Sequence, residues 1–164
     1  MELKDSVFYN SKASCLSDLN NPEEAIKCYD EAIKLDNKDP SYYYNKAACL
    51  VDVDRKEEAI SCYNQAIKLN PKDASVYYNK GRILYDLGNI VEAIKCYDEA
   101  LKFDKKDPSI YYNKGTCLSE INKNQEAIKN FEMALKLDPK NISYYINKIT
   151  CLMDLNKFKE AINV

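Results

Sequence analysis

Histidine is absent from this 164-residue chain, and so is any long apolar run. Without histidine the chain lacks the commonest general base, the commonest metal ligand and the usual partner of a Cys or Ser nucleophile. No run of about 18 apolar residues predicts a membrane-spanning helix, and the first residues do not resemble a secretory signal. We therefore expect neither an enzyme nor a protein that holds a metal or cofactor, and no membrane partner.

The sequence also lacks an excess of charge of one sign. Its 24 basic and 26 acidic residues are spread along the chain and give a formal charge of -2. This balance gives no electrostatic reason to expect nucleic acid as a partner. Seven cysteines without a recognisable signal indicate reduced thiols and a cytoplasmic location. None forms a Cys-x-x-Cys pair, so the recurring cysteines are expected to be small packing residues.

A Glu-Ala-Ile tripeptide recurs every 34 residues, with its alanine at Ala25, Ala59, Ala93, Ala127 and Ala161. Four residues later stands an aromatic residue, at Tyr29, Tyr63, Tyr97 and Phe131, and three further on another alanine. Spacing of four and then three predicts an amphipathic helix, such as 57–69. The first half of each unit has a similar rhythm and predicts another helix, such as 77–87. Short links rich in Asn, Asp and Gly join the two helices.

The unit resembles the tetratricopeptide repeat (TPR), a helix-turn-helix of 34 residues. The match rests on the tripeptide, the aromatic, the Asp/Asn-Pro ends and a small residue in each first helix, at Ala13, Ala47, Gly81 and Gly115. The resemblance implies an all-α fold, a right-handed superhelical solenoid of antiparallel helix pairs. We expect a single domain over 1–164, with four full repeats and a partial fifth, at 6–39, 40–73, 74–107, 108–141 and 142–164.

The sequence departs from the family pattern in three places. The family's early Trp is a tyrosine here, and its closing Pro remains only as Pro71 and Pro139. The Leu before the small residue is replaced by Lys12, Lys46, Lys80, Lys114 and Lys148. By angle these lysines face the apolar side of the helix. We expect their methylene stems to cover the adjacent helix while the amines reach water or a nearby Glu.

In TPR proteins the first helix of each pair lines a concave surface, and a polar stripe on the first helices fits that role. In the third repeat the stripe holds Ser75, Tyr78, Asn79, Arg82, Tyr85 and Asp86. Its most regular member is an asparagine, at Asn45, Asn79, Asn113 and Asn147. A column of side-chain amides can pair with successive peptide units of an extended chain. The alternative is that asparagine is simply frequent at this position of the family.

Beside the asparagines stand Tyr44, Tyr78 and Tyr112. Tyrosines on a concave surface supply contact area for a partner protein. The alternative is that these rings only pack against the adjacent helix. We favour the binding role, because the tyrosine before each of them (Tyr43, Tyr77 or Tyr111) is expected to occupy the core-facing position.

An acidic residue recurs two helical turns after Ser11 and after each of the four asparagines, at Asp18, Asp52, Asp86, Glu120 and Asp154. Acids that line a groove favour a partner with Lys or Arg. The alternative is a solvated column near the end of each helix. Only Arg82 brings positive charge onto the stripe.

The leading interpretation is a non-catalytic scaffold that binds an extended peptide or a helix of another protein in a concave groove. Two alternatives are a targeting or recruiting segment of a larger enzyme or assembly, and an RNA-binding helical repeat, which would need a basic groove. Some TPR proteins bind a C-terminal carboxylate through Lys and Arg beside Asn. The matching positions here lack a base, at Asn10, Ser14, Asn45, Ser75 and Asn79, so this mode is not expected.

The fifth repeat stops partway through its second helix, and Ile149 replaces the small residue of its first helix. Repeat arrays usually end in a polar capping helix. We therefore expect this unit to be frayed, or to be completed by more chain or by self-association with a second molecule.

Overall fold

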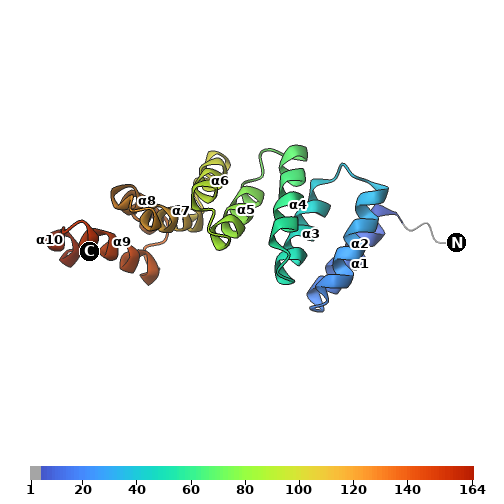
Figure 1. Cartoon of the computed structure of the whole chain (residues 1–164), viewed down its shortest axis with the longest axis horizontal. Helices are drawn as coiled ribbons and strands as arrows, with labels where there is room; N and C mark the ends of the chain where they lie inside the picture. The colour runs from blue at the N-terminus through green and yellow to red at the C-terminus, as the bar shows by residue number, and fades with distance from the viewer. Residues whose placement is uncertain (1–4) are drawn as a thin grey trace. The chain divides into compact units, whose positions relative to one another are not determined.

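The structure is a computed structural model that describes residues 5–164, and these form ten α-helices without a strand (Figure 1). The first helices of the repeats are α1 (Ser6–Asp18), α3 (Pro40–Asp52), α5 (Ala74–Asp86), α7 (Pro108–Glu120) and α9 (Ile142–Asp154). The second helices are α2 (Pro22–Leu35), α4 (Lys56–Leu69), α6 (Ile90–Phe103), α8 (Asn124–Leu137) and α10 (Phe158–Ile162). Among the described residues, no helix has the length and apolar character needed to cross a membrane.

The chain forms two compact units, Met1–Val76 and Tyr77–Val164. In the first unit α2 packs against both α1 and α3, and α4 packs against α3. In the second unit α8 packs against both α7 and α9, α6 packs against α7, and α10 packs against α9. A second helix therefore lies between its own first helix and the first helix of the next pair. That the whole chain is a single domain stays a prediction.

The helix boundaries follow local sequence signals. Asp39 and Asp107 precede a proline that starts α3 and α7, and each carboxylate accepts a hydrogen bond from the backbone N–H of the serine two residues later. These two Asp-Pro pairs therefore begin the next helix. The middle residue of the three-residue link inside each pair is in the left-handed region, with φ from 57° to 76°, at Asn20, Asp54, Gly88, Asn122 and Asn156. Asn, Asp and Gly tolerate this conformation best.

The two helices of a pair meet closely where a small residue faces an aromatic ring. A Cβ atom added to Gly115 would lie 2.7 Å from Cε1 of Phe131, and one added to Gly81 would lie 2.8 Å from Cε1 of Tyr97. Both rings are buried. Ala13 and Ala47, at the same register in the first unit, are also fully buried. The recurring small residue thus lets the aromatic of the second helix reach the backbone of the first.

One expected core position is wrong by one residue. Tyr43, Tyr77 and Tyr111 are only half-buried, whereas the residue before each of them is buried, at Tyr42, Val76 and Ile110. The reason is that a first helix packs against two second helices, its own and that of the preceding pair. Its buried face is therefore wider than the apolar stripe read from the sequence, and is turned relative to it. Among the cysteines at this face, Cys49, Cys117 and Cys151 are buried, whereas Cys15 is exposed.

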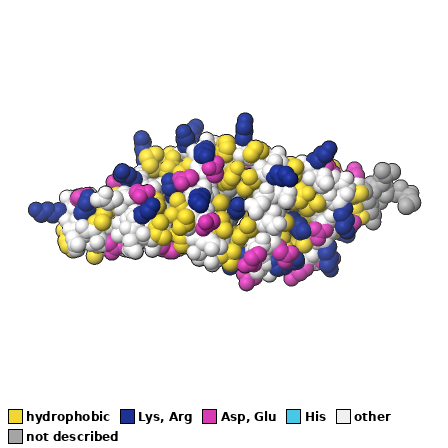
Figure 2. Space-filling model, turned by 45° about the horizontal axis from the view of Figure 1, so that its top comes forward, with side chains coloured by type: hydrophobic (Ala, Val, Ile, Leu, Met, Phe, Trp, Pro, Cys, Tyr) yellow, Lys and Arg dark blue, Asp and Glu magenta, His cyan; other side chains and the backbone are white. Residues whose placement is uncertain are grey.

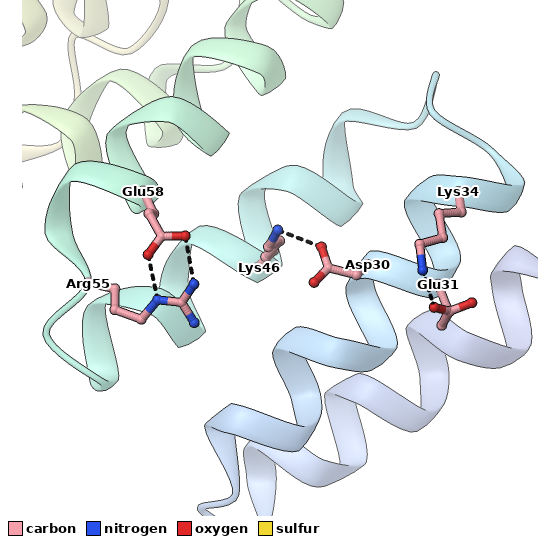
Figure 3. Close-up of polar contacts among 6 residues, drawn as sticks. All are labelled: Asp30, Glu31, Lys34, Lys46, Arg55 and Glu58. Atoms are coloured by element: carbon pink, nitrogen blue, oxygen red, sulfur yellow. Dashed lines mark hydrogen bonds and ion pairs between the residues drawn. The ribbon is translucent and has the colours of Figure 1, made fainter.

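The lysine that replaces the family's leucine forms ion pairs with the preceding second helix. Lys46 on α3 lies 2.5 Å from Asp30 on α2, as Figure 3 shows. Lys114 pairs in the same way with Asp98 at 2.6 Å, and Lys148 with Glu132 at 3.0 Å. The side chains of these three lysines are only 19–20% exposed, so their stems pack as expected. Lys34–Glu31 and Arg55–Glu58, also in Figure 3, are local pairs between residues three apart.

Gly115→Val tests the contact between Gly115 and the Phe131 ring. Because the ring is fully buried and cannot move aside freely, we expect the free energy of unfolding to fall by about 1–3 kcal/mol. Thr116→Val is the matched control, since it introduces the same side chain, nearly isosteric with threonine, at the next position of α7. Urea unfolding of both variants checks the prediction. Equal stability of the two would show that Phe131 does not limit the size of residue 115.

Candidate binding surface

The predicted site residues lie on the first helices and differ in exposure. The tyrosines Tyr44, Tyr78 and Tyr112 are half-buried, and so are Tyr85 and all four asparagines, Asn45, Asn79, Asn113 and Asn147. The charged members are exposed: Arg82, Asp52, Asp86 and Glu120. On α5 the amide of Asn79 and the rings of Tyr78 and Tyr85 are therefore partly enclosed, whereas the charged side chains are exposed.

The tyrosine rings pack against the second helix of their own pair. Ring centroids lie 5.8 Å apart for Tyr44 and Tyr63, and 6.1 Å apart for Tyr78 and Tyr97. Tyr112 lies 6.0 Å from Phe131, and 4.9 Å from Tyr144 on the next first helix. These rings therefore have a packing role, against the second helix of their own pair and, for Tyr112, against the next first helix.

Hydrogen bonds join the asparagine and tyrosine columns from one repeat to the next. Nδ2 of Asn113 donates to the hydroxyl of Tyr78 at 3.0 Å, and Nδ2 of Asn147 donates to the hydroxyl of Tyr112 at 3.2 Å. Each bond uses one of the two N–H donors of the amide. The bonds fix the orientation of the side-chain amides. Sequence reasoning missed them, although in both pairs the asparagine follows the tyrosine by 35 residues.

Two further contacts organise the charged members of the stripe in the second unit. The hydroxyl of Tyr85 donates a hydrogen bond to Oε1 of Glu120, and this bond raises the pKa of Tyr85 to about 12. The guanidinium carbon of Arg82 lies 6.0 Å from the ring centroid of Tyr78, within the range of a cation–π contact. Tyr85 thus ties the acid of α7 to α5, and the positive charge of Arg82 lies over a ring.

A hollow of about 180 Å³ brings two predicted site residues together. It is lined by Thr116, Ser119 and Glu120 from α7, Asn147 and Thr150 from α9, and Phe131 from α8. The threonine hydroxyls are turned to their own helices, because Thr116 donates to the carbonyl of Tyr112 and Thr150 to that of Ile146. The hollow is smaller than a typical small-molecule pocket and suits one side chain. The carboxylate of Glu120 gives it a negative edge.

The chain belongs to the tetratricopeptide repeat family. A family model described as "TPR repeat" matches residues 16–52, 55–88 and 81–120, and one described as "Tetratricopeptide repeat" matches 108–141. Together they cover more than half of the chain. No curated protein sequence matches it significantly.

Solved structures of TPR proteins share the fold. MamA from Desulfovibrio magneticus RS-1 (residues 41 to the end) is 20% identical with a TM-score of 0.90, over 98% of this chain and 90% of that chain. YrrB, described as a TPR protein with an unusual peptide-binding site, is 23% identical with a TM-score of 0.86, over 97% and 82%. PilF from Pseudomonas aeruginosa is 19% identical with a TM-score of 0.81, over 96% and 72%. The expected fold class, an all-α TPR solenoid, is confirmed, and such a fold is a scaffold for protein interactions.

Glu120→Gln tests the bond between Tyr85 and Glu120. We expect the pKa of Tyr85 to fall from about 12 toward the usual 10, because the phenol loses a charged acceptor. In the wild type the raised pKa stabilises the fold below pH 10, and this contribution is lost as the pH rises from 10 through 12. NMR titration of ¹³Cζ-labelled tyrosine measures the shift. Asp86→Asn, a change at the neighbouring acid, should have a smaller effect. A wild-type Tyr85 that titrates near 10 would contradict the bond.

Proposed function

We propose that the chain is a non-catalytic cytoplasmic scaffold that binds an extended peptide of another protein in a concave groove formed by the first helices. The groove would be lined by the asparagine and tyrosine columns and by Arg82, Tyr85, Asp52, Asp86 and Glu120. The observation that carries the proposal is the hollow between α7 and α9, because it places Asn147 and Glu120 around a space of side-chain size.

The fixed amides favour recognition of a peptide backbone. The bonds of Asn113 to Tyr78 and of Asn147 to Tyr112 hold both amides before a partner arrives. A binding group that is already ordered loses less conformational entropy when it binds. Each amide still has a second N–H donor and an acceptor oxygen, which are the groups needed to pair with a peptide unit.

The charge of the stripe favours a partner with basic residues. Glu120, Asp86 and Asp52 are exposed, whereas Arg82 lies over the ring of Tyr78. A Lys or Arg side chain that enters the hollow would meet the carboxylate of Glu120, and hydrogen bonds to charged groups are the stronger ones. The same acids oppose binding of RNA or of anionic membranes. On the face that Figure 2 shows, basic and acidic side chains are interspersed, without an extended basic area.

Two further observations are compatible with this proposal. The peptide-binding site described for YrrB occurs on a scaffold of the same fold. All seven cysteines are free thiols, which suits the reducing conditions of the cytoplasm. As a recruiting segment of a larger enzyme or assembly, the chain would use the same groove.

Binding of short unstructured peptides tests the groove. In an array of 12-residue peptides grouped as basic, acidic and neutral, we expect the chain to retain the basic group. Glu120→Gln should lower the affinity for the tightest-binding basic peptide about tenfold, because a hydrogen bond between charged groups is worth about 1.5–3 kcal/mol. Asn147→Ala should weaken basic and neutral peptides alike. Isothermal titration calorimetry measures both effects.

Glu92→Gln is the control, because Glu92 is an exposed acid at the start of α6, a second helix. It should leave peptide affinity unchanged. The proposal fails if no peptide class binds, or if Glu120→Gln and Glu92→Gln have the same effect.

We also propose that the fifth repeat mediates self-association. On the first helix of this repeat, α9, the apolar side chains of Ile142, Ile146 and Met153 are exposed.

A further inference from the structure

The hollow between α7 and α9 is lined by small residues at positions where the preceding repeat has large ones. Thr116 and Ser119 line it from α7. The residues 34 positions earlier, on α5, are Arg82 and Tyr85. Phe131, which is fully buried, lines the hollow from α8 with an apolar side chain. The repeat register therefore leaves room here for a side chain from another molecule, where an earlier repeat places side chains of its own.

The hydroxyl groups that line the hollow already donate their hydrogens within the chain. The two threonines donate to carbonyl groups of their own helices, and Ser119 donates to Oδ1 of Asn124 at 3.4 Å. The amide of Asn147 uses one of its N–H groups for the hydroxyl of Tyr112. Among the described residues that line the hollow, the second N–H of Asn147 is the one side-chain donor left for a ligand.

Hydrogen-bond acceptors remain on both sides of the hollow. Glu120 on α7 has Oε2, and Asn147 on α9 has Oδ1. Within the part of the chain that the structure describes, the bonds of these two side chains run through other atoms, Oε1 of Glu120 and Nδ2 of Asn147. Acceptors that include a carboxylate favour a positively charged donor over an anion or a carbonyl group.

The bond from Tyr85 to Glu120 distinguishes lysine from arginine. A guanidinium binds a carboxylate best through two parallel N–H···O bonds, which need both carboxylate oxygens. The hydroxyl of Tyr85 already donates to Oε1 of Glu120, so Oε2 is the oxygen left for a ligand. An ammonium is more compact, and its three diverging N–H groups need only single acceptors. It therefore suits both the acceptors and the volume of about 180 Å³.

We infer that this hollow is a lysine-specific pocket, which takes the ammonium of one peptide lysine in preference to an arginine. The inference rests on the proposed function, because that lysine belongs to the peptide in the groove. The ammonium bonds to Oε2 of Glu120 and Oδ1 of Asn147, and the methylene stem lies along Thr116 and Thr150. Tyr85 is a positioning residue: it does not touch the lysine, but it leaves Glu120 one oxygen for it.

Peptides that differ in one residue test the specificity. The probe is the basic peptide of the array that the wild type binds tightest, with each basic residue replaced in turn by lysine, arginine, acetyl-lysine and norleucine. At one position we expect lysine to bind about fivefold tighter than arginine and about tenfold tighter than either neutral residue, as isothermal titration calorimetry measures. If no position prefers lysine to arginine, the inference is wrong although the groove binds peptides.

Tyr85→Phe tests how the preference arises. This variant frees Oε1 of Glu120 for a guanidinium, so the preference for lysine over arginine should disappear. Tyr145→Phe is the matched control, because it removes a hydroxyl of α9 that donates to the carbonyl of Pro139 at 3.1 Å, outside the hollow. It should keep the preference of the wild type. If Tyr85→Phe weakens the lysine and arginine peptides equally, its role is only structural and the inference is contradicted.

Thr116→Met separates the pocket from a general attraction between the acids and a cationic peptide. The larger neutral side chain should fill the hollow, while Glu120 keeps its charge. We expect the lysine peptide to bind no tighter than the arginine peptide, and the norleucine peptide to bind as it does to the wild type. Circular dichroism confirms that the variant is folded.

The outcomes separate the pocket from the groove. A lysine preference that survives in Thr116→Met overturns the pocket and leaves the groove in place. A wild type that binds no peptide of any class overturns the groove, and the pocket with it.

Discussion

The close contact between a small residue on the first helix and an aromatic ring on the second helix sets the geometry of the pairs α5–α6 and α7–α8. At Gly115 and Gly81 the rings of Phe131 and Tyr97 come so near that even a methyl group would have to displace them. The same rings also contact a tyrosine of their own pair, with centroids 6.1 Å apart for Tyr97 and Tyr78 and 6.0 Å apart for Phe131 and Tyr112. The core contact thus positions the tyrosines of the candidate groove, so the stability of the pair and the shape of this surface depend on the same packing.

Ion pairs and hydrogen bonds between neighbouring helix pairs fix how the pairs are arranged, but they do not add a large apolar core. Lys46 and Lys114 reach acids on the preceding second helix, and their stems are mostly covered. Ion pairs of this partly buried kind contribute modestly to stability but fix the register of neighbouring helices. In the candidate groove, the hydrogen bonds from Asn113 to Tyr78 and from Asn147 to Tyr112 also fix the register of neighbouring first helices. In the second unit, ion pairs on one side of the first helices and hydrogen bonds on the other side therefore link neighbouring helix pairs.

The 34-residue period by itself determined the helices, their pairing and the positions of the left-handed turns, because local spacing, capping and turn residues specify these features. It also placed the polar stripe on the first helices, of which Asn113 and Glu120 are members. Only the tertiary structure showed that Val76 and Ile110, one residue before the expected tyrosines, are the buried ones, because a first helix packs against two second helices. The bond from Tyr85 to Glu120 and the hollow beside Asn147 also depend on how consecutive pairs pack. These contacts join residues about one repeat apart in the sequence, and no local sequence pattern encodes them.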